Sequence, residues 1–369
     1  MTWPEERARF PVLQRHAYLN AGTFGPLARA TVAAMEDLRA WEAVNGRGGR
    51  PYFDAMLERR ERVRALLAEQ IAVPPSHLAL TESTTQAVHV VVTGLGLGPG
   101  DEVVTTDAEH FGLTGPLAAS GASLRIARVR DAAAVDVFEL VRAQLTPRTR
   151  LLALSAVSWF DGTVFPWEEL REATGLPVLV DGAQSAGAIE VDASAADYYT
   201  LSAQKWLCGP DATGALYVRD PEALPARLVA YPSQAEYDIA AGTWEPKPGA
   251  ARFDPGFAPA TSMAGLEAAL TGLPRGRFER ARSLTERCRE LLAAEGHDVA
   301  TEAGQGTLVA FRWPGAPGAA DAAEASAQLY QRGVIVRDLP GTNLLRASVG
   351  WWNDGSDLER LVEGLAALR

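Results

Sequence analysis

The sequence predicts an α/β fold with one large domain and a smaller partner. The chain has 369 residues, of which 47% are hydrophobic, and this is enough to bury the cores of two such domains. Short strand-like runs occur at 78–81, 101–106, 151–155 and 177–180, and a helical pattern over 82–92 separates the first two. The run at 177–180 is continuously apolar, which is typical of a strand buried in a parallel sheet.

The first eighty residues predict packing elements and a turn. Residues 18–26 pass from a strand-like start into a glycine turn, and Pro26 is placed to open a helix. Apolar residues at helical spacing predict helices over 27–42 and 53–70. The glycine string at 94–100 predicts a turn between helix and strand, because proline stands where a dinucleotide-binding helix would begin.

Charge and composition exclude several classes of function. The net charge of -11 argues against broad binding to nucleic acid or to anionic membranes. Two cysteines, Cys208 and Cys288, cannot build a disulfide framework. The five histidines are dispersed, so we expect no metal site. No signal peptide pattern or membrane span is evident, and the sequence predicts a cytoplasmic protein.

The stretch from Leu179 to Gly209 carries the strongest chemical signal. The strand at 177–180 leads into Asp181, small residues follow, and a second strand-like run at 197–202 leads to Lys205. Ligands of open α/β sheets bind at such carboxyl ends. Pyridoxal phosphate (PLP) needs a lysine to hold its aldehyde as a Schiff base and an acid to keep its ring nitrogen protonated. Taken singly, a lysine and a strand-end aspartate are also common surface residues.

The motif VDGAQSAG, followed by DYYTLSAQKW, resembles the class V aminotransferase group of fold-type I PLP enzymes, which includes cysteine desulfurases and cysteine/cystine C–S lyases. The resemblance implies that Lys205 forms the Schiff base and that Asp181 meets the pyridine nitrogen. It implies that Gln184 approaches the phenolic oxygen and that Ser202 contacts the phosphate. Gln204 stands where the family commonly has a histidine that contacts the phosphate, and the resemblance implies the same contact for Gln204.

The resemblance also implies an architecture. A large PLP-binding domain over 21–255 would hold a mostly parallel seven-stranded sheet between helices, with an antiparallel strand at 214–218. A smaller α+β domain would cover 256–369, and residues 1–20 would pack on it. The chain would form a homodimer. Residues 231–255 are rich in glycine, proline and charge, and predict loops.

Further cofactor contacts follow from the same resemblance. Thr84 and Thr85 open the helix after the strand at 78–81, where hydroxyl groups and free amides form an anion site, although a simple helix cap needs only one of them. His110 follows the next strand, at the place of the residue that stacks on the pyridine ring; a lone loop histidine is otherwise a surface group. The resemblance favours ring stacking by His110 over a role as catalytic acid or base.

The substrate side is predicted from both halves of the chain. Asn20 lies in a YLNxG segment that passes the active site in the family, and Trp159 either lines the pocket or belongs to the core. A long helix is expected from 263 to 291, and a capping box at 356–359 opens the last helix. Arg346, in LLRAS, matches the family's carboxylate-binding arginine, and Arg337 is a second anchor or a salt-bridged strand end.

The predicted mechanism depends on the lack of a cysteine in the loop at 338–345. Cysteine desulfurases carry a nucleophilic cysteine on the loop that corresponds to 338–345, and this loop has none. Cys208 is expected to pack as a small apolar residue. The sequence therefore predicts a C–S lyase that eliminates sulfur from a cysteine-type amino acid. Aminotransferase, epimerase and oxidative deaminase activities use the same residues and stay open, as does a catalytically silent scaffold; a nicotinamide dehydrogenase is disfavoured by the missing fingerprint.

Overall fold

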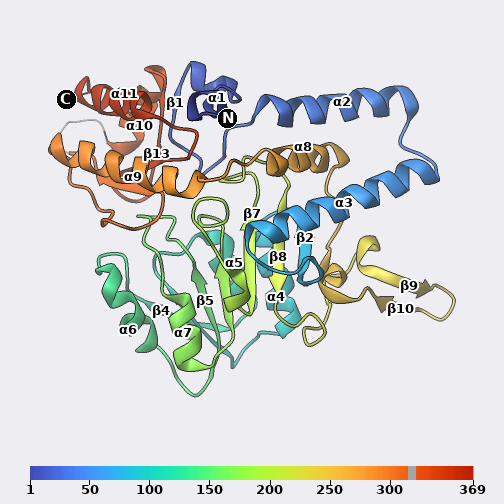
Figure 1. Cartoon of the computed structure of the whole chain (residues 1–369). Helices are drawn as coiled ribbons and strands as arrows, with labels where there is room; N and C mark the ends of the chain where they lie inside the picture. Colours follow the sequence, from blue (N-terminus) through green and yellow to red (C-terminus); the bar gives the residue numbers. More distant parts are fainter. Residues whose placement is uncertain (315–320, 369) are drawn as a thin grey trace.

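A seven-stranded sheet organises the protein, whose computed structural model describes residues 1–314 and 321–368 (Figure 1). The strand order is β2-β8-β7-β6-β5-β3-β4, and every strand is parallel to the others except β8. This confirms the predicted α/β class and the antiparallel strand at 214–218. The strands are β2 (Leu78–Thr81), β3 (Glu102–Thr106), β4 (Ser123–Ala127), β5 (Thr149–Ser155), β6 (Val178–Asp181), β7 (Tyr198–Ser202) and β8 (Gly214–Val218).

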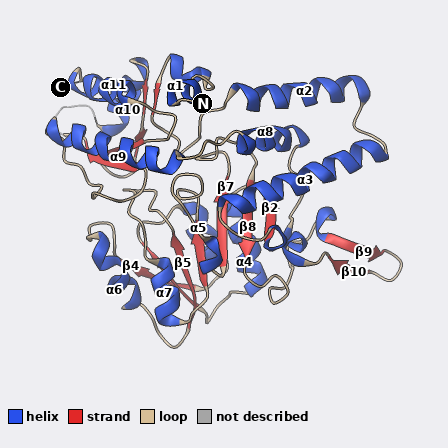
Figure 2. Ribbon diagram, viewed as in Figure 1, coloured by secondary structure: helices blue, strands red, loops and turns tan. Residues whose placement is uncertain are grey.

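Helices cover both faces of the sheet (Figure 2) because its central strands are apolar on both sides. Leu152 and Leu154 of β5 point into one core, and Leu151 and Ala153 point into the other. The first core also holds side chains of α3, α6 and α7, and the second holds those of α4 and α5. The helices are α3 (Arg50–Gln70), α4 (Thr84–Leu95), α5 (Phe111–Ala119), α6 (Val137–Arg142) and α7 (Trp167–Thr174).

A smaller unit lies beyond the carboxyl ends of the parallel strands (Figure 1). Its antiparallel sheet has the order β11-β14-β13, and a third apolar core joins this sheet to three helices. Its elements are β11 (Leu308–Arg312), β13 (Arg337–Asp338), β14 (Leu344–Ser348), α9 (Arg277–Ala294), α10 (Ala322–Gln331) and α11 (Gly355–Ala366). None of the described helices is long and apolar enough to cross a membrane.

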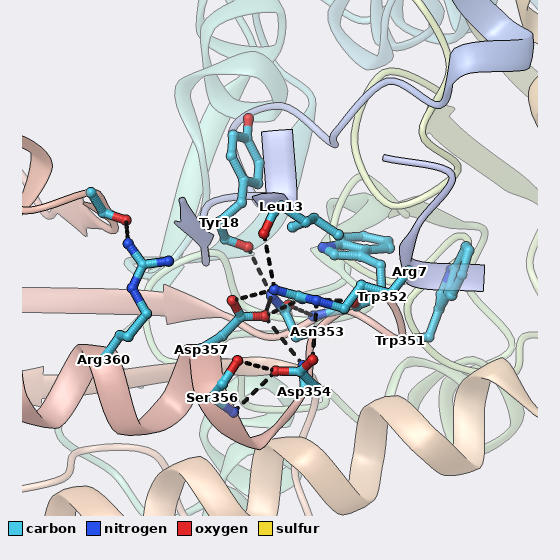
Figure 3. Close-up of polar contacts among 12 residues, drawn as sticks. Arg7, Leu13, Tyr18, Trp351, Trp352, Asn353, Asp354, Ser356, Asp357 and Arg360 are labelled. Atoms are coloured by element: carbon cyan, nitrogen blue, oxygen red, sulfur yellow. Dashed lines mark hydrogen bonds and ion pairs between the residues drawn. The ribbon is translucent and has the colours of Figure 1, made fainter. Parts of the chain in front are cut away.

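The amino-terminal segment is bound to this smaller unit (Figure 3). Strand β1 (Ala17–Tyr18) pairs in parallel with β12 (Val334–Ile335). The Arg7 guanidinium donates hydrogen bonds of 2.6 and 2.9 Å to the two carboxylate oxygens of Asp357, at the start of α11. Asn353 Nδ2 donates to the Tyr18 carbonyl at 3.1 Å. The domain boundaries at residues 20 and 255 stay predictions.

Helix ends differ from the sequence-based prediction at several points. The long helix expected from residue 263 is wrong, because α8 (Ala260–Thr271) ends before Gly272, Pro274 and Gly276, and α9 begins at Arg277. Proline cannot donate the next helical hydrogen bond, and Gly276 has φ +73°. The last helix begins at Gly355 and is capped by Asp354, two residues before the predicted cap. The first long helix is α2 (Arg29–Asn45).

The sequence predicted loops over residues 231–255, but the structure has two strands in this segment. Strands β9 (Gln234–Asp238) and β10 (Thr243–Pro246) form an antiparallel hairpin that projects from the body of the molecule (Figures 1 and 2). Apart from Gln234, every residue of both strands is exposed. The sequence of β9, QAEYD, does alternate polar and apolar residues. Neither face of the hairpin is buried, however, and the surrounding glycine, proline and charged residues predicted loops. Short 3-10 helices are η1 (Pro11–Gln14), η2 (Pro75–His77), η3 (Ala134–Asp136), η4 (Ala193–Ala195), η5 (Tyr231–Ser233) and η6 (Gly249–Phe253).

Candidate active site

One cavity collects most of the predicted site residues. It lies where β3, β5, β6 and β7 end, which is the edge of a parallel sheet that binds ligands. The predicted residues that line it are Thr84, Thr85, His110, Trp159, Asp181, Gln184, Ser202, Gln204 and Lys205. The sequence did not single out the other lining residues, Ser83, Gly112, Ser155, Val157 and Ala183.

Lys205 presents a primary amine whose electrostatics suit Schiff-base chemistry. Burial lowers the pKa of the Lys205 amine to about 8, although Asp181 opposes the shift. Among the described residues, no side chain or carbonyl forms a hydrogen bond or ion pair with this amine. The chain has only one other lysine, Lys247. A buried amine with a lowered pKa is a nucleophile near neutral pH.

Asp181 ends β6 and lies in register with Ser155 of β5 and Thr200 of β7. Its carboxylate accepts a hydrogen bond of 2.9 Å from the Ala183 amide. Burial raises the pKa of Asp181, whereas that hydrogen bond and the Lys205 charge lower it. The carboxylate therefore lies in a buried position where a protonated ring nitrogen would stabilise its charge.

The backbone around Lys205 is fixed by contacts with the amino-terminal segment. Gly25 N donates to the Gln204 carbonyl at 2.7 Å, and Gln184 Nε2 donates to the Gly22 carbonyl at 2.9 Å. Gln184 Oε1 accepts from Trp206 Nε1 at 2.9 Å. These bonds fix the Gln184 amide at the cavity wall and leave one of its two N–H groups for a ligand oxygen.

The start of α4 forms the anion-binding end of the cavity. The Ser202 hydroxyl contacts Thr84 Oγ1 at 2.8 Å and accepts from the Thr84 amide at 3.2 Å. Ser83 caps the helix by accepting from Gln86 N. Hydroxyl groups and helix amides together suit a phosphate group. Gln204 Oε1 is buried and has no hydrogen-bond partner among the described residues, so this side chain also has a polar atom to offer.

His110 caps α5 and is held as a neutral ring. Its Nδ1 accepts a hydrogen bond of 3.0 Å from Gly112 N, which puts the remaining ring proton on Nε2. Burial, and then the Lys205 charge, lower the pKa of His110. Trp159 packs edge-on against the imidazole at a centroid distance of 5.4 Å. The fixed, neutral ring supports the predicted stacking role.

The structure places Arg346, Arg337 and Asn20 outside the residues that line the cavity. Arg346 is 2% exposed and donates to the Trp159 carbonyl, and its Nε has no partner among the described residues. Burial, and then Arg337 opposite it in the β13–β14 pair, lower the pKa of Arg346 to about 9. Such a buried cation gains from an anionic ligand. Asn20 Oδ1 instead accepts from the Thr23 hydroxyl.

The set of side chains fits pyridoxal phosphate. One cavity offers an unpaired buried amine, a buried carboxylate, a neutral imidazole and a hydroxyl-lined helix start. No cluster of three or more His, Cys, Asp or Glu side chains that could hold a metal ion occurs in residues 1–314 and 321–368.

Comparisons with known proteins agree with this geometry. Isopenicillin N epimerase of Streptomyces clavuligerus is 29% identical over 99% of this chain and 98% of its own length. Cysteine desulfurase of Dickeya dadantii is 32% identical over 72% of this chain and 69% of its own. A solved structure of the cystine C–S lyase C-DES with cysteine persulfide matches at a TM-score of 0.90 and 26% identity, covering 97% of this chain and 99% of that one.

A second C-DES structure, a mutant with glycine covalently linked to the PLP cofactor, also matches at a TM-score of 0.90 and 26% identity, over 98% of this chain and 99% of that one. The family profile described as "Aminotransferase class-V" matches residues 18–361. The family and the PLP-linked neighbour imply pyridoxal phosphate as the cofactor. The chain belongs to the class V aminotransferase family of PLP-dependent enzymes.

Proposed function

We propose that the protein is a C–S lyase that acts by β-elimination on cysteine, cystine or an S-conjugated cysteine. The products would be a keto acid, ammonia and a thiol or persulfide. The similarity to C-DES, a cystine C–S lyase, supports a sulfur-containing amino acid as the substrate.

The state of the two cysteines carries this proposal. Residues 338–345 contain no cysteine, and Cys208 and Cys288 are 3% and 1% exposed. Burial raises the pKa of both thiols, that of Cys288 to about 12. A desulfurase needs a thiolate that accepts sulfur from the substrate. Since burial keeps both thiols from acting as sulfur acceptors, we expect the sulfur to leave with a product of the elimination.

Each site residue then has a defined task. PLP, when bound, supplies an electron sink for the bonds at the substrate α-carbon. Lys205 would hold the cofactor aldehyde, and its free amine nitrogen would accept the substrate α-proton. Asp181 would accept a hydrogen bond from the ring nitrogen and so keep that nitrogen protonated, and His110 would stack on the ring. Arg346 binds the substrate carboxylate when it exchanges its bond to the Trp159 carbonyl for two carboxylate oxygens.

Epimerisation is the second candidate, because the similarity to isopenicillin N epimerase extends over 99% of this chain. An epimerase returns the α-proton on the opposite face and releases no keto acid. Transamination and oxidative deamination start from the same lysine and acid. A silent scaffold is disfavoured because Lys205 and Asp181 line one cavity.

Absorption spectroscopy of the purified protein with PLP tests the proposal. The wild type should show a bound-cofactor band at roughly 410–430 nm. Lys205→Ala should lack this band, and Lys247→Ala, the matched control at the other lysine, should keep it. Added cystine should then yield pyruvate without any keto acid co-substrate. A band without pyruvate would assign transamination, epimerisation or another conjugate, and no band would overturn cofactor binding itself.

A further inference from the structure

A second buried carboxyl group lies beside the candidate active site. Glu109, the residue before His110, is 8% exposed. Its Oε1 lies 2.8 Å from Thr106 Oγ1 at the end of β3. Its Oε2 accepts from the amide of Ser155 at 3.0 Å and from its hydroxyl at 2.5 Å, at the end of β5. The carboxyl group therefore joins the ends of two strands that are neighbours in the sheet.

This group is connected directly to the residues that would surround the cofactor. Ser155 lines the cavity and is the register partner of Asp181. His110 follows Glu109 in the chain and caps α5. Moving the Glu109 side chain would thus disturb both the ring that is expected to stack on the cofactor and the strand end beside Asp181.

Charge balance indicates which of the two carboxyl groups is protonated. No lysine, arginine or histidine within the described residues forms an ion pair with Glu109. Burial is the main cause that raises the pKa of Glu109 to about 7; the hydrogen bonds from Ser155 and Thr106 oppose this shift, and the Asp181 charge adds to it. Asp181, in contrast, has the Lys205 charge to stabilise its anion. Two buried carboxyl groups in one site share a proton, and the proton stays on the group that lacks a cation.

A neutral Glu109 carboxyl group is compatible with the hydrogen bonds around it. A protonated Oε1 can donate to Thr106 Oγ1, which has two lone pairs and already accepts from Ala108 N at 3.2 Å. Oε2 keeps both donors of Ser155. A neutral carboxyl group therefore loses none of its three contacts.

We propose that Glu109 is a positioning residue of the cofactor site that works in its neutral form. It holds the ends of β3 and β5 together, so that His110 and Asp181 lie in fixed places around the cofactor ring. It also leaves Asp181 as the one ionised carboxylate beside the ring nitrogen. This inference rests on the cofactor binding proposed above.

Paired substitutions at Glu109 and Glu102 test the inference. Glu102 lies at the opposite end of β3, is 3% exposed, and contacts Thr146 and Arg148. We expect Glu109→Ala to weaken the affinity of the apo-protein for PLP by roughly 10- to 100-fold, because a buried anchor with three hydrogen bonds is lost. Glu109→Gln, which reproduces the neutral carboxyl group, should stay within about threefold of wild type. Glu102→Ala and Glu102→Gln should also stay within that range, whatever they do to thermal stability.

The pH dependence of the bound-cofactor band separates positioning from simple structural support. The ionisable groups around these strand ends are Asp181, His110, Lys205 and Arg346. If Glu109 is neutral in the holo-protein, Glu109→Gln removes no charge, and the titration midpoint of the band should stay within about 0.3 pH unit of wild type. An ionised Glu109 would move that midpoint by about one unit or more.

Each result has one meaning. Wild-type affinity in Glu109→Ala overturns the positioning role, and a weakened or pH-shifted Glu109→Gln overturns the neutral form. If Glu109→Ala does not fold, Thr106→Val replaces it, and we expect its PLP affinity to fall by about 3- to 10-fold. Wild-type PLP affinity in Thr106→Val would then overturn the positioning role. A wild type without a band removes cofactor binding and this inference together. A normal wild-type band with unaffected PLP affinity in Glu109→Ala removes this inference alone.

Discussion

The Lys205 amine should leave a signature in the stability of the apo-protein. Its pKa falls from an ordinary 10.5 to about 8 on folding, so the unfolded chain binds more protons between these two values. Stability should therefore rise with pH across this window, by up to about 1.4 kcal/mol per pH unit, and be lost as the pH falls toward 8. Urea denaturation of wild type and Lys205→Met, compared from pH 7.5 to 10, measures this difference. Lys247→Met should keep the wild-type slope, and a Lys205→Met slope equal to wild type would contradict the prediction.

Gly25 should be irreplaceable because backbone, and not a movable side chain, lies where its Cβ would be. A Cβ there would lie 1.9 Å from the Lys205 carbonyl oxygen. Gly25→Ala must push the two backbone segments apart, and we expect a loss of roughly 1–3 kcal/mol in stability together with weaker PLP binding. Gly256→Ala is the control, since nothing lies within 4 Å of its added Cβ. Denaturation and PLP titration of both variants would show the contrast, and equal behaviour would refute the steric argument.

At the scale of elements, the amino-terminal segment connects the smaller unit to the cavity. The Arg7–Asp357 pair (Figure 3) and the β1–β12 pair hold one end. The hydrogen bond from the Gly25 amide to the Gln204 carbonyl holds the other. Asp357 is completely buried, and Arg7 is 17% exposed. Asp357→Ala should cost roughly 2–3 kcal/mol, less than for a fully buried pair, because Arg7 keeps Asp354 and some solvent contact.

Asp298→Ala provides the comparison for that substitution. Asp298 pairs with Arg312 on the surface, where the side chains are 71% and 60% exposed, and we expect a change below about 1 kcal/mol. Chemical denaturation of Asp357→Ala and Asp298→Ala would measure both losses in the free energy of unfolding. Similar small losses would mean that the Arg7–Asp357 pair does not anchor the segment.

Elements that bury a face were predictable, and elements defined by long-range contacts were not. The apolar runs at 151–155 and 177–180 correspond to β5 and β6, because strands covered on both faces are largely apolar. The β9–β10 hairpin was missed because its alternating residues bury neither face and lie among glycine, proline and charged residues that predict loops. The division between α8 and α9 had a local signal in Gly272, Pro274 and Gly276, which the prediction did not use.

The candidate site shows the same division at the scale of the whole molecule. The ordered motif around Asp181 and Lys205 predicted residues that line one cavity, because consecutive parallel strands bring their ends to one edge. Glu109 gave no such signal, since its burial depends on Thr106 and Ser155 from two different strands. The position of Arg346 against the Trp159 carbonyl likewise depends on packing between distant segments.

The β9–β10 hairpin leads to a prediction about assembly. Two-stranded hairpins are marginally stable alone, and this one exposes apolar side chains, with Tyr237 59%, Ile239 87% and Trp244 40% exposed. We expect a homodimer in which a second copy of the chain covers the hairpin. Ile239→Asp combined with Trp244→Asp should then shift the protein toward monomer in sedimentation velocity, because a buried charge opposes association.

Tyr330→Ser on α10 is the control for a general loss of surface hydrophobicity. Tyr330 is 55% exposed, and α10 lies at the opposite side of the molecule from the hairpin (Figure 1). This variant should sediment as the wild type does. A monomeric wild type would contradict the expected dimer, and a dimer that survives both charged substitutions would place its interface on another surface, leaving the hairpin without an explanation for its exposed apolar residues.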